Sequence, residues 1–286
     1  MKKSASTSFT RQKNTRVARL WVALLLLSAA LQAQGDLLVF PKRVVFENGK
    51  KTETLNLVNR GEDTATYKIS FVQVRMTETG AFETITEPDE GQNFADPYIR
   101  FYPRSVRLAP GESQVVKLQL IKSGNLAPGE YRSHLYLRAE PSGKNAENKT
   151  PADSGSVSVR LTPIYGLTVP TIIRAGATTG EVALENLSLL QNPGAAPSLS
   201  LELHRSGSSS VYGTLTVEHI SPEGAVAKVG EVAGLAVYTP GTRRKCILPL
   251  RPAEGVDLTK GQLKVIYSAP PEAKSRQLAS AFLYLF

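Results

Sequence analysis

The sequence predicts an all-β protein built from antiparallel sandwiches or barrels. Beyond residue 34, apolar and polar residues alternate with a period of two along most of the chain, as half-buried strands require. Eighteen prolines and 22 glycines interrupt these runs, which disfavours long helices. The length of 286 residues fits two domains of ordinary size.

Residues 1–33 have the three parts of a secretory signal peptide. A basic stretch without acidic residues precedes an apolar run at 20–31, and small alanines follow up to Ala33. The apolar run is shorter than the roughly 20 residues of a membrane-spanning helix. We therefore expect cleavage after Ala33 and export, with an uncleaved membrane anchor as the alternative.

The net charge of +9 belongs largely to this N-terminal segment. Six of the 34 lysines and arginines lie in residues 1–33, which leaves 28 of them against 25 acidic residues in the rest of the chain. Because the exported part is close to neutral, a nucleic-acid partner is not expected.

Strand-like runs follow one another in both halves of the chain, separated by turn signals such as Asn48-Gly49 and Pro110-Gly111. Two segments, 181–191 and 275–286, fit either a short helix or a strand, and we favour strands. The apolar residues of the clearest runs are Leu55/Leu57, Tyr67/Ile69/Phe71, Val116/Leu118/Leu120, Leu135/Leu137, Val157/Val159/Leu161, Leu199/Leu201/Leu203, Leu215/Val217 and Leu263/Val265/Tyr267.

The domain boundary is expected near residues 170–176. Val169-Pro170 closes a strand-like run, and the glycine-containing stretch 175–180 follows it. We assign residues 34–172 to the first domain and 173–286 to the second. The polar segment 141–153 is interpreted as a long loop between two strands of the first domain.

The residue types needed for catalysis or metal binding are scarce. The chain has three scattered histidines and one cysteine, Cys246, which we interpret as a buried structural thiol rather than a reactive one. No Gly-x-Ser-x-Gly elbow, HExxH motif or phosphate loop is present, and the segment Gly207-Ser-Ser-Ser210 has the composition of a turn. We predict neither an enzyme nor a metal, cofactor or small-molecule site.

Four segments of the first domain follow one another in a characteristic order. They are Pro41–Phe46, Leu55–Arg60, Val106–Leu118 and Gly129–Leu137. Their order and spacing resemble the PapD-like periplasmic pilus-assembly chaperones, and the resemblance covers about residues 37–170. The best matching element is the Leu-x-Pro-Gly-x-x-x-x-Val-x-Leu segment that starts at Leu108 and leads toward Glu-Tyr-Arg.

The resemblance implies two immunoglobulin-like β-sandwich domains set at an angle, with a cleft between them. It implies a chaperone in the periplasm of a Gram-negative bacterium, which completes an unfinished pilus or fimbrial subunit by lending it a strand and delivers it to an outer-membrane usher. No cofactor is implied. Self-association through the lent edge is left open, and so is a rival interpretation as an exported scaffold or cell-surface binding protein.

Two places are candidates for subunit binding. Val157, Val159 and Leu161 share one face of the expected strand 154–169, and Arg160 lies on the other face. The alternative is that these side chains line the domain's own core. A strand at this position also favours a lender of strands over a pilin subunit, which lacks its final strand.

Arg43 is the second candidate. In the resembled family an arginine on the first strand and a lysine near the domain junction hold the C-terminal carboxylate of the subunit. Arg43 stands in the matching segment, with a solvated edge-strand arginine as the alternative. Residues 156–173 contain no lysine, and Arg160 and Arg174 are the nearest basic residues.

Overall fold

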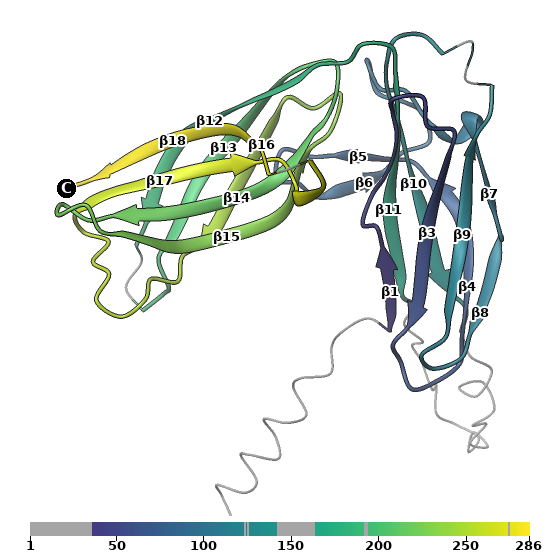
Figure 1. The fold of residues 1–286 in the computed structure, drawn as a ribbon, viewed down its shortest axis with the longest axis horizontal. Coiled ribbons are helices and arrows are strands. Elements are labelled where there is room, and N and C mark those ends of the chain that lie inside the picture. Colours follow the sequence, from purple (N-terminus) through teal and green to yellow (C-terminus); the bar gives the residue numbers. More distant parts are fainter. Residues whose placement is uncertain (1–35, 123, 125, 142–163, 192–193, 274) are drawn as a thin grey trace, which may run out of the picture.

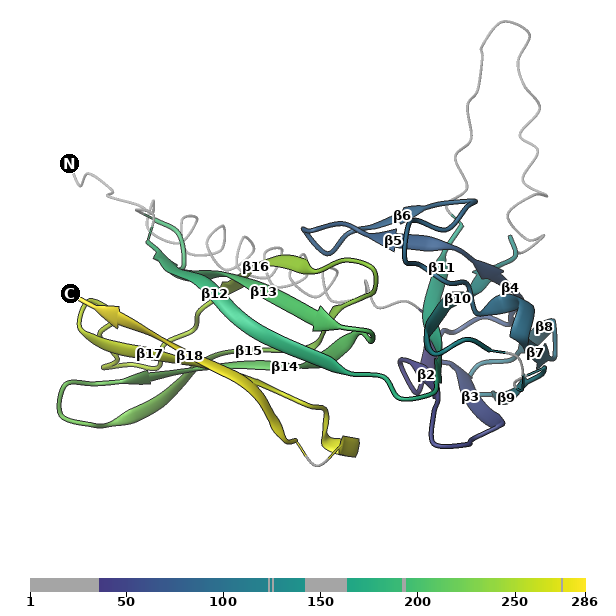
Figure 2. The same cartoon turned by 90° about the horizontal axis from the view of Figure 1, so that it is seen from above.

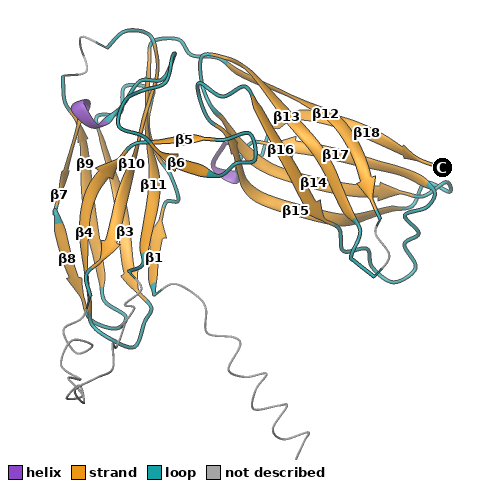
Figure 3. Ribbon diagram, turned by 180° about the vertical axis from the view of Figure 1, so that it is seen from behind, coloured by secondary structure: helices purple, strands orange, loops and turns teal. Residues whose placement is uncertain are grey.

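The protein consists of two β-sandwich domains set at an angle (Figures 1 and 3). The computed structural model describes residues 36–122, 124, 126–141, 164–191, 194–273 and 275–286. The prediction of an all-β, two-domain protein is confirmed. No helix in these residues is long and apolar enough to span a membrane.

The first domain packs a four-stranded sheet on a five-stranded one. The four-stranded sheet has the order β1 (Leu37–Phe40), β3 (Thr52–Asn59), β9 (Ser113–Leu120), β7 (Ile99–Tyr102). The five-stranded sheet has the order β2 (Val44–Phe46), β11 (Gly166–Ala175), β10 (Gly129–Ala139), β4 (Ala65–Val72), β8 (Ser105–Leu108). All of these pairs are antiparallel except β2 with β11, which is parallel over three residues.

The alternation in the sequence decides which side chains form the core of the first domain. Leu55 on β3 lies opposite Val116 on β9, and both are fully buried. Leu135 and Leu137 of β10 close the core from the other sheet. Each such side chain contributes about 1.5–3 kcal/mol when it leaves water, so period-two burial is what fixes the register of the sheets.

The second domain packs a three-stranded sheet on a four-stranded one. Its sheets have the orders β12 (Gly180–Leu190), β13 (Ser198–Gly207), β16 (Arg243–Pro249) and β15 (Val226–Val237), β14 (Val211–Ile220), β17 (Gly261–Ser268), β18 (Gln277–Leu285). Both ambiguous segments are strands, β12 and β18. Cys246 packs half-buried against this core, and burial raises the pKa of its thiol.

The strand β11 continues through the expected boundary at 172/173. Ile172 and Ile173 pair with β10 on one side and with β2 on the other, and the strand ends at Ala175. Pro170 therefore lies inside a strand and does not close it. β2 pairs with β11 only from residue 171 onward, so at Pro170 no described strand pairs with β11 on the side opposite β10. Proline is tolerated in such edge strands.

A hairpin of the first domain reaches across to the second domain (Figure 2). It consists of β5 (Val74–Met76) and β6 (Phe82–Thr84). At its tip the backbone carbonyl of Glu78 accepts a 2.6 Å hydrogen bond from the N–H of Lys245 on β16, and the two side chains form an ion pair of 3.2 Å. The two domains therefore touch at the hairpin tip as well as around their connecting strand.

Candidate functional site: the cleft between the domains

A cleft of about 760 Å³ lies between the two domains. The first domain contributes the β1–β2 turn and the end of β11, and the second contributes the loop before β14 and the segment that precedes β18. Basic residues dominate its charged lining: Lys42, Arg43, Lys50, Arg174 and Arg276 against Glu47 and Glu53.

Arg43 lines this cleft just before β2, and it is not the solvated edge residue of the alternative interpretation. The centre of its guanidinium lies 4.4 Å from the centroid of the Tyr212 ring of β14. Its Nε is buried and has no hydrogen-bond partner among the described residues. Burial lowers the pKa of Arg43, although the charge of nearby Glu130 partly offsets this.

Arg174, a basic residue on β11, also lines the cleft, but each of its three side-chain nitrogens already has a partner. Its Nη1 lies 3.0 Å from the carboxylate of Glu47, and its Nε lies 3.4 Å from that of Glu130. Its Nη2 donates to the carbonyl of Ser210, 3.0 Å away. Because all three nitrogens of the side chain have partners, Arg174 is poorly placed to bind another anion. It stabilises the interface between the two domains, which is called the joint below.

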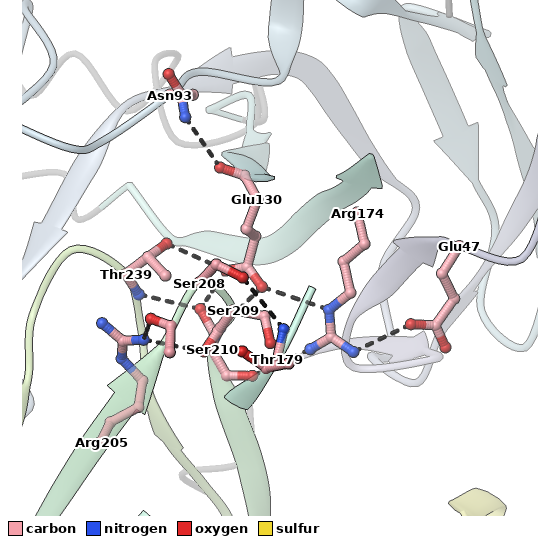
Figure 4. A network of polar contacts seen from close by, with 11 residues as sticks. Glu47, Asn93, Glu130, Arg174, Thr179, Arg205, Ser208, Ser209, Ser210 and Thr239 are labelled. Atoms are coloured by element: carbon pink, nitrogen blue, oxygen red, sulfur yellow. Dashed lines mark hydrogen bonds and ion pairs between the residues drawn. The ribbon is translucent and has the colours of Figure 1, made fainter. Parts of the chain in front are cut away.

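Glu130 is the centre of that joint (Figure 4). Its carboxylate is fully buried in the first domain's β10, yet it accepts hydrogen bonds from the second domain. The donors are the N–H of Ser210 at 2.9 Å, the hydroxyl of Ser210 and the hydroxyl of Thr239 at 3.2 Å. A buried carboxylate needs such donors to offset the loss of hydration, so this residue ties the two domains together.

Arg205 of β13 holds the two loops that surround Glu130. Its guanidinium donates to the carbonyls of Gly207 and Ser209 in one loop, at 2.7 and 3.1 Å. It also donates to the carbonyls of Pro240 and Gly241 in the other loop, at 3.3 and 2.9 Å. Ser208, Ser209 and Ser210 form the short connection between β13 and β14, in agreement with the turn predicted there, and this connection is part of the interface between the domains.

His134 of β10 is buried beneath the hairpin and the second domain. Its Nδ1 lies 3.4 Å from Nη1 of Arg132, which can only donate, so Nδ1 accepts and the imidazole is neutral. Its ring centroid lies 5.2 Å from that of Phe82 and 6.1 Å from that of Tyr238. Burial first, and then the charge of Arg132, lower the pKa of His134 to about 3.

This depressed pKa predicts a loss of stability in weak acid. The imidazole titrates near 6.5 in an unfolded chain, so between about pH 6.5 and 3 only the unfolded chain binds the extra proton and stability falls as the pH falls. From pH 7 to pH 5, wild type should lose about 2 kcal/mol of unfolding free energy relative to His134→Phe. Urea unfolding at both pH values measures this.

Between pH 7 and pH 8 the difference between these two proteins should change by only about 0.2 kcal/mol, since most unfolded imidazoles are already neutral at pH 7 and the folded one is neutral throughout. An equal difference at pH 5 and pH 7 would mean that folding does not shift the titration of His134.

One apolar face of β11, continued by Tyr165 directly before the strand, passes from the core into solvent. Side chains two residues apart share a face of a strand, and here Val169 is 2% exposed, Leu167 40% and Tyr165 72%. Residues 166–170 pair with β10 on one side, whereas β2 pairs only with residues 171–173 on the other. Over its first half, the backbone edge of β11 opposite β10 therefore pairs with no strand among the described residues.

Four of the five expected subunit contacts, Val157, Val159, Arg160 and Leu161, lie outside the described residues. The fifth, Arg43, lies in the cleft. Tyr165, Leu167 and Tyr212 were not predicted from the sequence. The period-two pattern that selected Val157, Val159 and Leu161 continues through Tyr165 and Leu167 and could have found these two, but nothing in the sequence connects Tyr212 with Arg43.

Among the described residues, no group of three or more His, Cys, Asp or Glu side chains could hold a metal ion. The polar residues of the cleft serve instead to join the domains and to place one guanidinium at the cleft surface.

The sequence matches no family model, and no curated protein matches it either. Solved structures are similar in fold. The complex of the chaperone CsuC with the tip subunit CsuE, from archaic chaperone-usher pili of Acinetobacter baumannii, has a TM-score of 0.43 at 12% identity over 88% of this chain and 98% of that chain. The YadV chaperone has a TM-score of 0.41 at 11% identity over 88% of this chain and 100% of that chain.

The Salmonella enterica SafA pilin in complex with the SafB chaperone has a TM-score of 0.41 at 13% identity, and the match covers 89% of this chain and 98% of that chain. All three of these solved structures contain a chaperone. Identity at this level bears on the fold alone and does not assign a function to this chain.

Proposed function

We propose that this protein is a periplasmic chaperone of the PapD-like family, which binds incomplete fimbrial subunits and delivers them to an outer-membrane usher. The observation that carries the proposal is the first half of β11, where a backbone edge without a partner strand among the described residues coincides with an apolar face that runs out of the core. The order and spacing of the four sequence segments in the first domain support the same function.

Donor-strand complementation accounts for this edge. A subunit that lacks its final strand exposes an apolar groove and two unpaired edges, which invite aggregation. A lent strand supplies backbone hydrogen bonds along its open side and apolar side chains for the groove. Leu167 and Tyr165 each contribute about 1.5–3 kcal/mol when fully buried, before ordering costs. In the sequence, Leu161, Val159 and Val157 precede these residues at a spacing of two, and the proposal includes them in the donated segment.

Arg43 has the chemistry to anchor the end of the bound subunit. A planar guanidinium pairs both oxygens of a carboxylate, and Arg43 lies in the basic cleft without an ion pair among the described residues. A terminal carboxylate held there would set the register of the subunit along β11. The lysine of the resembled family has no counterpart on the described part of β11, so Arg43 carries this role without it.

The remaining features of the proposal follow from the resemblance and the N-terminal segment. The protein reaches the periplasm through its signal peptide and acts without ATP, metal or cofactor. The subunit leaves when a better-fitting strand replaces β11. When no subunit is bound, the open edge is available to a second copy of this chain.

Co-purification tests the proposal. A tagged wild-type protein is expected to retain a small β-rich subunit from periplasmic extract, and Leu167→Arg is expected to lose it because a charge cannot enter an apolar groove. Val115→Arg is the matched control, since Val115 is 45% exposed on β9 of the opposite sheet. Mass spectrometry identifies the captured protein.

Equal capture by wild type, Leu167→Arg and Val115→Arg would contradict strand donation through β11. If wild type retains nothing while fimbrial subunits are being expressed, the chaperone function is wrong and the exported scaffold takes its place. The absence of the protein from periplasmic extract would overturn the location.

A further inference from the structure

Arg43 is a partly buried cation in the cleft lining, and it forms no ion pair with a carboxylate among the described residues. Glu130 is the carboxylate that acts on it through space, and Glu130 is already bound to Arg174, Ser210 and Thr239. Arg174 adds a like charge nearby. A buried guanidinium without a counter-ion is costly, and a long side chain in that position would be expected to turn away into water.

The contact with Tyr212 explains why the guanidinium of Arg43 remains in the cleft. Its ring lies against Arg43 at 4.4 Å from centroid to Cζ, within the range in which the face of an aromatic ring attracts a cation. The ring of Tyr212 lies against the guanidinium, and the Nη groups of Arg43 make no hydrogen bond to a described residue, whereas its Nε is buried. A carboxylate is bound in the plane of a guanidinium, so the arginine keeps its Nη donors while losing its freedom to rotate.

The stacking residue belongs to the other domain. Tyr212 lies on β14, two residues beyond Ser210, which binds Glu130 across the joint. It also packs in the small apolar cluster that Ile172 of β11 forms with Ala236 and Tyr238. The position of the ring relative to Arg43 therefore depends on how the two domains are joined.

We propose that Tyr212 is a positioning residue for the carboxylate site: it holds the Arg43 guanidinium in the cleft, so that a site made by the first domain is completed by the second. This inference rests on the role of Arg43 in the proposed function. It makes the second domain necessary for anchoring a subunit terminus even though the donated strand belongs entirely to the first.

The test follows the side-chain Nε–H resonance of Arg43 by NMR in the purified protein, assigned by its loss in Arg43→Lys. Acetate is the probe for a carboxylate, and acetamide is the control of the same shape without charge. Acetate should shift the Arg43 resonance in wild type, and acetamide should not. Tyr212→Phe keeps the ring face and should bind acetate within about twofold of wild type.

Tyr212→Leu should bind acetate about tenfold more weakly, because Arg43 is no longer held in one orientation. Tyr212→Met, which is similar in size and has no ring, should behave in the same way if the leucine variant folds poorly. Tyr284→Leu removes an exposed tyrosine elsewhere in the second domain and should leave acetate binding unchanged.

Wild-type acetate affinity in Tyr212→Leu or Tyr212→Met would overturn the role of Tyr212 and leave the Arg43 anchor standing. If acetate leaves the Arg43 resonance of wild type unmoved, the anchor itself fails, and the positioning role fails with it. The two failures are thus told apart by which protein gives the negative result.

Discussion

Replacing Glu130 with alanine is expected to lower the free energy of unfolding by about 3–5 kcal/mol, the range for breaking a buried charged pair. The substitution leaves the N–H of Ser210 and the hydroxyl of Thr239 without their acceptor, and it deprives Arg174 of one of its two carboxylates. It also removes the negative charge that favours the charged forms of Arg43, Arg132 and Arg205.

Chemical denaturation measures the loss of unfolding free energy. Small-angle scattering measures whether the angle between the domains is still fixed. The radius of gyration of Glu130→Ala should increase, because the angle between the domains is no longer fixed at its centre. Glu47→Ala is the matched control: it removes the other carboxylate of Arg174, which is partly exposed, and should cost less than about 1 kcal/mol. If the two variants lose the same stability, Glu130 has no special part in joining the domains.

Replacing Arg205 with alanine is expected to cost about 3–5 kcal/mol, of the size seen when a buried hydrogen-bond network is broken. Arg205 is almost fully buried and is the donor to four carbonyls in two loops. Without it, these loops lose the contact that holds them together around Glu130. Arg205→Lys should restore only part of the stability, since an ammonium cannot present the planar fork that reaches both loops.

Arg251→Ala is the control for Arg205, because Arg251 is an exposed arginine of the same domain, and its replacement should change the unfolding free energy by less than about 0.5 kcal/mol. The double variant Glu130→Ala/Arg205→Ala should lose less than the sum of the single losses, since both residues stabilise the same two loops. Strictly additive losses would mean that Arg205 stabilises the second domain independently of the joint.

The strands of both domains could be predicted because each strand shows the alternation of apolar and polar residues within its own sequence. Leu55 and Leu57, or Leu263 and Val265, are buried on one face while their neighbours in sequence are not, and this requires only the period of two. The same pattern could not decide the segment 181–191, where leucine spacing fits a helix too. Pairing of β12 with β13 decided it.

Only those parts of the site could be predicted for which the sequence shows a periodic pattern or a resemblance to a known family. Arg43 came from the segment Pro41–Phe46, and an open donor edge was expected near residues 155–165. The exposed apolar side chains that the structure shows are Tyr165, directly before β11 and at the end of that stretch, and Leu167, on β11 and just beyond it. Pro170 misled the sequence interpretation, because a proline ends a strand only where its missing N–H is needed, and an edge does not need it.

By itself, the sequence determined the all-β architecture and the two halves of the chain, since burial with a period of two is a local property. Only the tertiary structure decided that Glu130 meets Ser210 and Thr239, that Arg205 ties the loops around it, and that Tyr212 stacks on Arg43. The partners of Glu130 and of Arg43 belong to the other domain and carry no periodic signal in the sequence. Their contacts depend on the way in which the two sandwiches meet, whereas Arg205 joins loops within the second domain.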